Sequence, residues 1–296
     1  LFLISFLLLS CNKTTNNNKK MNDSAPFVPP VSYEKADSVA HEILSKMTID
    51  EKVEMIGGHN MFYTYGIERL GIPSLLMSDA TQGIRMLPHI EEKIGKSVAF
   101  PSPTSLAATW NPSLAYEYAK SIGEECRAAG ISILLGPGVN IYRVSQNGRN
   151  FEYFGEDPFL GSKMIEQYIK GVQSTGVVAT LKHFLCNNHE YHRRTTNVIV
   201  DERTLQEIYL PIFKAGIDAG AMAVMTSYNM VNGEYCAQSD FVIKYLLRDQ
   251  LKFKWLVMSD WWSTYDPEKV IKSGLDLEMP GHTIETSPNI KALGKP

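Results

Sequence analysis

Apolar residues recur at three- and four-residue steps in several stretches of the chain, which is the spacing of one helix face. The clearest such stretch runs over residues 33–47. Thr48 followed by Glu51 matches a capping box for a second short helix, and Asn111-Pro112 is typical of the start of a longer one. The pattern predicts further helices over residues 160–174, 202–219 and 239–250.

Short apolar runs that end in polar residues lie between these helices, over residues 74–79, 131–135, 177–182, 222–228, 256–260 and 275–278. Short buried strands that alternate with amphipathic helices are typical of an α/β fold with a parallel sheet. An open sheet often binds its ligand beside a Gly-rich phosphate loop, and no such motif follows a run here. Nearly every run instead ends in a candidate functional residue, which favours a closed (β/α)8 TIM-barrel-like fold. We expect this barrel to be incomplete at its C-terminal end, because no closing helix follows the last run.

The start of the chain indicates export. Residues 1–11 are apolar but fall short of the roughly 20 residues that a stable membrane span needs, so they resemble the core of a signal peptide. Leu8-Leu9-Ser10-Cys11 resembles a bacterial lipobox, although an ordinary export signal that happens to contain a cysteine is the alternative. Residues 12–31 predict a disordered tether, and residues 32–296 the barrel. We therefore expect an exported bacterial lipoprotein of the periplasm or outer membrane, attached to a membrane only through a lipid anchor at Cys11.

Composition excludes several classes of protein. The chain has 29 Lys+Arg and 32 Asp+Glu, a net charge of −3, with 44% hydrophobic residues, which indicates a globular protein and argues against a nucleic-acid partner. Its four cysteines are widely spaced, with no CxxC pair for a zinc ribbon, and we expect Cys126, Cys186 and Cys236 to be buried apolar groups. His189 and His192 are three residues apart rather than the four of HExxH, so we expect no metal and no other cofactor.

The ends of the predicted strands carry side chains that suit a polyhydroxylated ligand. Charged groups form strong hydrogen bonds with hydroxyls, and an aromatic face packs on the C–H face of a sugar ring. A carboxylate at a strand end can also attack an electrophilic carbon, although a lone Asp there is more often a loop cap. The candidates are Asp79, Arg85, Arg149, Lys182, His183, Met225, Tyr228, Asp260 and Trp261.

Six motifs resemble those of glycoside hydrolase family 3, and they occur in the family's order between Tyr33 and Gly281. Residues 78–85 are similar to its SDGPxGIR segment. Residues 136–141 together with residues 147–158 resemble its GPxxNI…GRNFEYFGEDP stretch. The KHF, MxSYN and nucleophile motifs correspond to residues 182–184, 225–229 and 258–261, and residues 276–281 match the segment that follows.

The resemblance implies a barrel that hydrolyses β-glycosides with retention, through a glycosyl-enzyme ester on Asp260. The terminal sugar of a β-glucoside or oligosaccharide would be bound by five residues that match the motifs, and three others would line the same subsite. The five are Asp79, Arg149, Lys182, His183 and Tyr228, and the three are Arg85, Met225 and Trp261. We expect the positive charges of Lys182 and Arg149 to keep Asp260 ionised.

Two departures from the family pattern bear on activity. Trp255 stands where the nucleophile motif carries a glycine, which raises the question of backbone strain at the start of that strand. The family's β-glucosidases take their acid/base Glu from a second α/β domain, which we expect to be missing here, and the alternative KHFPGHG loop of a sister branch reads KHFLCNN. Glu156 and Asp157 are weaker candidates for the acid. We therefore expect this chain alone to be a weak or inactive hydrolase.

Three hypotheses stay open at this stage. The first is an exo-acting β-glucosidase, the second a catalytically inactive sugar-binding lipoprotein, and the third a metal-dependent hydrolase built on a barrel. Within the family, a β-xylosidase or another exo-β-glycosidase is the alternative to a β-glucosidase, and the Asp79 segment favours the glucosidase.

Overall fold

The centre of the molecule is a parallel sheet, described here from a computed structural model that covers residue 27 and residues 29–281. Its 5 strands follow the order β10-β7-β5-β4-β3, and all neighbouring pairs are parallel. Each strand overlaps an apolar run that predicted it, although β5 continues past the end of its run at residue 182. Their bounds are β3 (Met77–Ser78), β4 (Ile133–Leu134), β5 (Val178–Phe184), β7 (Ala223–Thr226) and β10 (Leu256–Met258).

Shorter segments connect the two edges of this sheet. On one side Leu277 forms a parallel bridge to Met258 of β10, and the adjacent Glu278 forms one to Gly57. Gly57 leads into β1 (Gly58–His59), which pairs antiparallel with β2 (Tyr63–Thr64). Tyr63 then bridges to Leu76, beside β3. These bridges therefore close the strands into a continuous ring. The ring is least regular between β10 and β3, where single bridges take the place of longer strand pairing.

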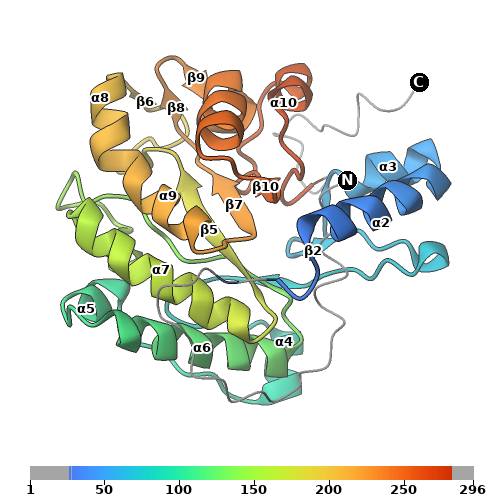
Figure 1. Cartoon of the computed structure of the whole chain (residues 1–296), viewed down its shortest axis with the longest axis horizontal. Coiled ribbons are helices and arrows are strands. Elements are labelled where there is room, and N and C mark those ends of the chain that lie inside the picture. The colour runs from blue at the N-terminus through green and yellow to red at the C-terminus, as the bar shows by residue number, and fades with distance from the viewer. Residues whose placement is uncertain (1–26, 28, 282–296) are drawn as a thin grey trace.

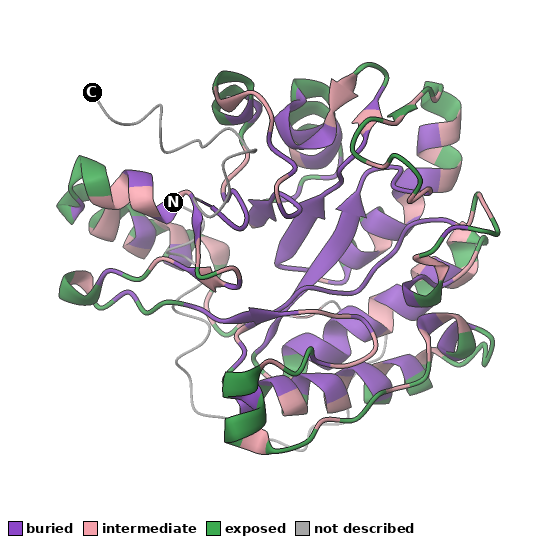
Figure 2. Ribbon diagram, turned by 180° about the vertical axis from the view of Figure 1, so that it is seen from behind, coloured by how far each residue is buried: buried purple, intermediate pink, exposed green. Residues whose placement is uncertain are grey.

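The helices that follow the strands cover the outer face of the ring. The main ones are α6 (Pro112–Ala129), α7 (Pro158–Ser174), α9 (Leu210–Asp218) and the π-helical η5 (Phe241–Gln250). Figure 1 shows these helices ranged along the outside of the strands. In Figure 2 the strands of the central sheet are buried, whereas these four helices each have a buried inner face and a more exposed outer face. The (β/α) TIM-barrel-like class predicted from the sequence is confirmed.

Local sequence signals explain where several helices begin. The Asn111 side chain accepts a hydrogen bond from the Leu114 amide, and Pro112 occupies the first turn of α6. Thr48 and Glu51 form the reciprocal capping box expected for α3 (Ile49–Met55). Helix α2 (Tyr33–Lys46) precedes it with Ala36 and Ala40 buried, as the three- and four-residue spacing predicted.

Several short elements have no clear signal in the sequence. They are the helices α4 (Pro88–Ile94), α5 (Pro103–Ala107), α10 (Pro267–Ser273), η1 (Glu68–Leu70), η2 (Asn150–Glu152) and η4 (Cys236–Gln238). A small sheet also forms from β6 (Asn197–Val198), β8 (Met230–Val231) and β9 (Glu234–Tyr235). These elements have between two and seven residues, too few positions for a period to show. By contrast, α8 (Glu202–Thr204), η3 (Leu205–Tyr209) and α9 follow one another within the helix predicted over residues 202–219.

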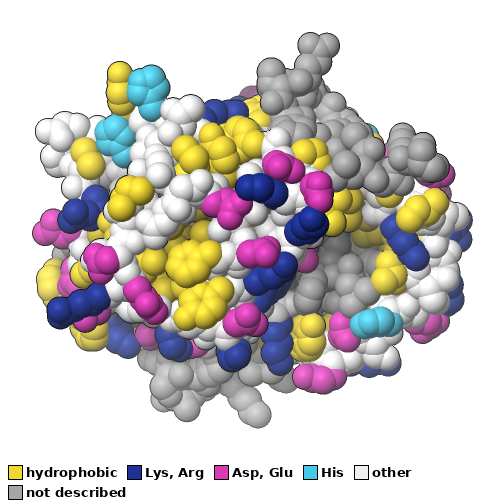
Figure 3. Space-filling model, turned by 90° about the horizontal axis from the view of Figure 1, so that it is seen from above, with side chains coloured by type: hydrophobic (Ala, Val, Ile, Leu, Met, Phe, Trp, Pro, Cys, Tyr) yellow, Lys and Arg dark blue, Asp and Glu magenta, His cyan; other side chains and the backbone are white. Residues whose placement is uncertain are grey.

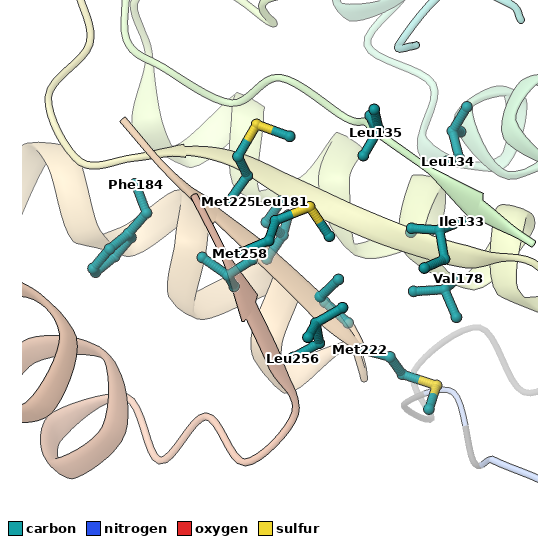
Figure 4. Close-up of a cluster of buried hydrophobic side chains, with 14 of the residues drawn as sticks. Ile133, Leu134, Leu135, Val178, Leu181, Phe184, Met222, Met225, Leu256 and Met258 are labelled. Atoms are coloured by element: carbon teal, nitrogen blue, oxygen red, sulfur yellow. The ribbon is translucent and has the colours of Figure 1, made fainter. Parts of the chain in front are cut away.

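The hydrophobic core lies between the strands and the surrounding helices. Figure 4 shows labelled side chains from β4, β5, β7 and β10 within one cluster, among them Ile133, Leu181 and Met258. Strands that are buried on both faces read as nearly continuous apolar runs, which is why these strands were recognisable. Cys126, Cys186 and Cys236 are buried and carry free thiols, as predicted.

Trp255 produces no strain at the start of β10. Its φ is not among the positive values that the described non-glycine residues adopt, so the position does not need a glycine's freedom. The indole packs edge-on against Tyr33 of α2, with the ring centroids 5.3 Å apart. The large side chain therefore joins α2 to the base of the barrel.

The surface agrees with the near-neutral composition. The face in Figure 3 mixes Lys and Arg with Asp and Glu around a patch of hydrophobic side chains, and neither sign of charge dominates it. Among residues 27 and 29–281, no helix combines the length and apolar character that crossing a bilayer requires. The predicted signal segment, Cys11 and nearly all of the tether lie outside the described residues, so these predictions stay predictions.

Candidate active site

The structure brings all the candidate residues together around one pocket. This pocket has a volume of about 400 Å³ and lies where the strands of the ring end. Its lining includes Asp79, Arg85, Arg149, Lys182, His183, Met225, Tyr228, Asp260 and Trp261, which are the site residues named from the sequence. The shared C-terminal edge of the parallel strands explains how residues so far apart in the chain converge.

Asp260 is one of the residues that line the pocket, and it comes two residues after β10. One carboxylate oxygen, Oδ1, accepts a hydrogen bond of 2.7 Å from the backbone amide of Trp261. The other, Oδ2, is buried without a hydrogen-bond partner and lies 3.6 Å from Nε2 of His183. Ser263 fixes the backbone of this turn, since its hydroxyl donates to the Asp260 carbonyl at 2.9 Å. The residue is thus held by its backbone while one oxygen stays available.

Burial and neighbouring charge act on Asp260 in opposite directions. Burial raises the pKa of this carboxyl, while the positive charges of Arg149 and Lys182 lower it. The cations therefore act as the sequence predicted, but burial is the larger effect and the pKa ends above its usual value. The reason is that the low-dielectric pocket disfavours the charged form unless hydrogen bonds replace the lost water.

A network of cations and carboxylates forms the polar wall of the pocket. Lys182, which is 2% exposed, has its Nζ 3.5 Å from Oδ1 of Asp79 and 3.8 Å from Oε2 of Glu152. Arg149 donates a short hydrogen bond from Nε to the other oxygen of Glu152. Arg85 lies at the rim, 3.8 Å from Asp79. Glu152 is 4% exposed and neutralises two of the cations, a role that was not predicted from its position in the sequence.

Other residues that line the pocket are apolar or aromatic. The Trp261 indole donates a hydrogen bond of 2.9 Å to the Met61 carbonyl, and its ring centroid lies 5.4 Å from that of Phe62. Tyr228 is 5% exposed, and the guanidinium of Arg193 lies over its ring at 4.1 Å from the centroid. Burial raises the pKa of Tyr228, with a further contribution from the nearby Asp260, so the phenol keeps its proton.

Four lining residues escaped the sequence interpretation: Met61, Phe62, Arg193 and Trp262. Met61 and Phe62 follow β1, a strand too short to be recognised. Arg193 belongs to the long loop after β5, where the histidines drew attention to a possible metal instead. Trp262 could have been proposed as a site residue, because it directly follows Trp261 in the sequence. It was missed because the family motif ends at Trp261.

Other residues considered from the sequence lie elsewhere or act structurally. Asp157 accepts a hydrogen bond of 2.9 Å from the Phe159 amide and so caps α7, and neither it nor Glu156 is among the residues that line the pocket. Within the described part of the chain, no three His, Cys, Asp or Glu side chains are grouped so as to hold a metal ion.

The chain belongs to the glycosyl hydrolase family 3, because residues 34–290 match the model of the family's N-terminal domain. Among its relatives is the thermostable β-glucosidase B of Acetivibrio thermocellus, which is 44% identical over 263 residues, 85% of this chain and 34% of the relative. A β-glucosidase of Rhizobium radiobacter is also 44% identical, over 81% of this chain and 29% of its own length. The chain therefore spans about a third of the length of these relatives.

Solved structures show the same fold. The β-glucosidase 3B of Thermotoga neapolitana in complex with glucose matches with a TM-score of 0.81 and 37% identity, over 86% of this chain and 38% of that one. The β-glucosidase of Kluyveromyces marxianus in complex with glucose matches with a TM-score of 0.78 and 39% identity, over 83% of this chain and 30% of that one. These likenesses extend over most of the barrel described above.

Proposed function

We propose that this chain carries the sugar-binding subsite and the nucleophile of a retaining, exo-acting β-glucosidase. The observation that carries the proposal is the Oδ2 atom of Asp260, a buried carboxylate oxygen without a hydrogen-bond partner in a pocket lined by cations and aromatic rings. The relatives named as β-glucosidases support glucose as the sugar.

In the proposed reaction, Asp260 attacks the anomeric carbon of the terminal glucosyl residue. A bond forms between Oδ2 and C1 while the bond between C1 and the glycosidic oxygen breaks, and the leaving oxygen takes a proton. Water then cleaves the glycosyl ester, which restores the carboxylate and releases glucose with its original configuration. Burial favours the first of these two steps, because a poorly solvated carboxylate loses its charge when the ester forms.

The polar wall is proposed to hold the glucose hydroxyls. Asp79 offers acceptor oxygens, and Lys182 and Arg149 offer donors that Glu152 keeps oriented. Tyr228, Met225 and Trp261 are proposed to contact the sugar ring itself. Hydroxyl contacts that tighten as the ring becomes oxocarbenium-like would raise the rate as well as the affinity.

The acid that protonates the leaving group is proposed to come from sequence outside this chain. Within the pocket the other carboxylates are engaged, since Asp79 pairs with Lys182 and Arg85, and the nearby Glu152 pairs with Arg149 and Lys182. General acid catalysis contributes about 10²–10⁴-fold in rate, so this chain alone should hydrolyse natural glucosides poorly.

The test uses a substrate that needs no proton donor. A 2-deoxy-2-fluoro-β-glucoside with a dinitrophenolate leaving group should add one fluoroglucosyl mass to the peptide that contains Asp260, as read by mass spectrometry. Asp260→Asn should remove the adduct, whereas Asp276→Asn, outside the pocket, should keep it. An adduct on another residue would place the nucleophile elsewhere.

Two alternatives give different results in the same experiment. A sugar-binding protein without catalysis would bind glucose by calorimetry but form no adduct, even as a longer protein. A β-xylosidase would label faster with the corresponding fluoroxyloside. Lipidation at Cys11 and export also remain proposals, to be tested by the mass of the mature N-terminus.

A further inference from the structure

Asn140 is a buried residue just behind the pocket, in the segment that follows β4. It is 3% exposed and is not among the residues that line the pocket. Its Nδ2 donates to the carbonyl of His183 at 2.9 Å, and its Oδ1 accepts from the amide of His183 at 2.9 Å. Because both bonds run to backbone groups of fixed polarity, the amide can lie only one way round.

The same Oδ1 atom also faces the imidazole ring. It lies 3.2 Å from Nδ1 of His183, and an amide oxygen can only accept a hydrogen bond. Nδ1 must therefore carry the proton of this contact. The Tyr153 hydroxyl, 3.4 Å from Nδ1, is compatible with this because a hydroxyl can accept as well as donate.

The imidazole has one proton rather than two. His183 is 1% exposed, and burial, with Arg149 and Lys182 nearby, lowers its pKa well below the usual value. With that proton on Nδ1, the other nitrogen, Nε2, presents a lone pair. It faces Oδ2 of Asp260 at 3.6 Å, too far for a hydrogen bond and without a proton between the two atoms.

We propose that Asn140 is a positioning residue that fixes His183 as a hydrogen-bond acceptor, so that Nε2 and Oδ2 of Asp260 form an edge that binds a hydroxyl donor. The sugar as ligand rests on the function proposed above, but the tautomer does not. A His183 with its proton on Nε2 would point a donor at the carboxylate and stabilise its charge, which would weaken the nucleophile. The acceptor form leaves the carboxylate free until a hydroxyl of the ligand enters.

The tautomer can be measured directly on the whole chain. In protein labelled with ¹⁵N-histidine, we expect a protonated, pyrrole-type Nδ1 and an unprotonated, pyridine-type Nε2 for His183. The signals would be assigned by their loss in His183→Gln. The opposite pattern, with the proton on Nε2, would overturn the proposal regardless of any activity.

A variant and a matched control test the role of Asn140. Asn232 makes the same pair of bonds, each 2.9 Å, to the backbone of Val200 on an exposed loop. Both Asn140→Leu and Asn232→Leu remove such a pair, so both should lose stability. Only Asn140→Leu should move protonation towards Nε2 and slow fluoroglucoside labelling, by about tenfold, the worth of one hydrogen bond.

The outcomes separate this proposal from the proposed function. A wild-type tautomer and labelling rate in Asn140→Leu would refute the positioning role. If the wild-type chain forms no adduct at all, the proposed function fails, while the tautomer measurement still decides the role of Asn140. If Asn140→Leu does not fold, two measurements on the wild-type chain test the positioning proposal instead. They are the tautomer seen in the ¹⁵N spectrum and the affinities for monodeoxy glucoses. We expect at least one deoxy sugar to bind about tenfold more weakly than glucose; equal affinities would contradict the hydroxyl-binding edge.

Discussion

Two aspartates beside β10 show how one residue type can serve opposite purposes. Oδ2 of Asp276 accepts hydrogen bonds from Arg248 at 2.7 Å and from the Val257 amide at 2.8 Å. Asp260, which follows the C-terminal end of the strand, has one carboxylate oxygen bonded to the Trp261 amide and the other without a hydrogen-bond partner. Burial raises the pKa of both carboxyls, and nearby cations oppose it in both.

The difference between them is therefore one of hydrogen bonding rather than of burial or charge. Asp276 is satisfied and ties η5 to the sheet, which makes it a structural residue. Asp260 is left incompletely satisfied, a state that costs stability and that a fold retains where the group has a use. The following predictions test this contrast.

The largest expected effect is on chemistry. Asp260→Asn should lower the rate of fluoroglucoside labelling at least about 10³-fold, because an amide oxygen is a poor nucleophile. Asp276→Asn should label within about threefold of the wild type, since its carbonyl oxygen can still accept both hydrogen bonds. Rates would be followed by intact-protein mass spectrometry. Similar losses of labelling rate in the two variants would contradict the proposal that Asp260 is the nucleophile and Asp276 a structural residue.

The second effect concerns stability, and here the larger loss is expected at Asp276 rather than at Asp260. Asp276→Ala should lower the free energy of unfolding by about 3 kcal/mol, because it leaves the Arg248 charge and the Val257 amide without this partner in a largely buried site. Asp260→Asn should cost nothing or add stability. Urea unfolding at pH 7 measures both values. A destabilised Asp260→Asn would mean that the carboxylate is better satisfied than its contacts indicate.

A third, smaller effect on the labelling rate is expected from Glu152, the buried acid beside the pocket. Glu152→Gln keeps the shape of the side chain but removes the charge that pairs with Arg149 and Lys182. We expect labelling to slow by about 10- to 100-fold, the value of one charge-assisted hydrogen bond. Glu166→Gln, at an exposed ion pair with Lys163, is the control and should leave the rate unchanged.

The smallest effect is the pH dependence of the stability of Asp260→Asn relative to wild type. A carboxyl whose folded-state pKa is raised favours folding below its unfolded pKa, about 3.9, and this contribution is lost as the pH rises through the folded pKa. The variant should therefore unfold at a higher temperature than wild type at pH 7, with a difference that shrinks towards pH 4. A difference that grows on acidification would show that the pKa is lowered instead.

Sequence reasoning succeeded best where a signal was long or repeated. The helices α2, α6 and α7 and the strands of the central sheet were recognisable from apolar period and caps. Likewise, the nine site residues could be named because each follows a strand or stands in a recognisable motif, and the structure places them in one pocket. Their chemical roles stay predictions until the labelling experiment.

The residues that sequence reasoning missed depend on pairing between distant segments. Met61 and Phe62 reach the pocket only because β1 and β2 complete the ring through single bridges to Glu278 and Leu76. Glu152 could be seen within a motif, but its burial between Arg149 and Lys182 could not. The strand and helix periods carry no information on such contacts, because they describe one element at a time.

The sequence by itself determined the α/β class, most of the strand and helix order and the identity of the chemical groups at the strand ends. These follow from local rules, since hydrophobic period, caps and strand-end residues are properties of short stretches. Only the tertiary structure decided which oxygen of Asp260 lacks a partner, which acid neutralises the cations and which way the Asn140 amide faces His183. Those features arise because the ring brings distant residues within a few ångströms, where desolvation and hydrogen-bond geometry set their chemistry.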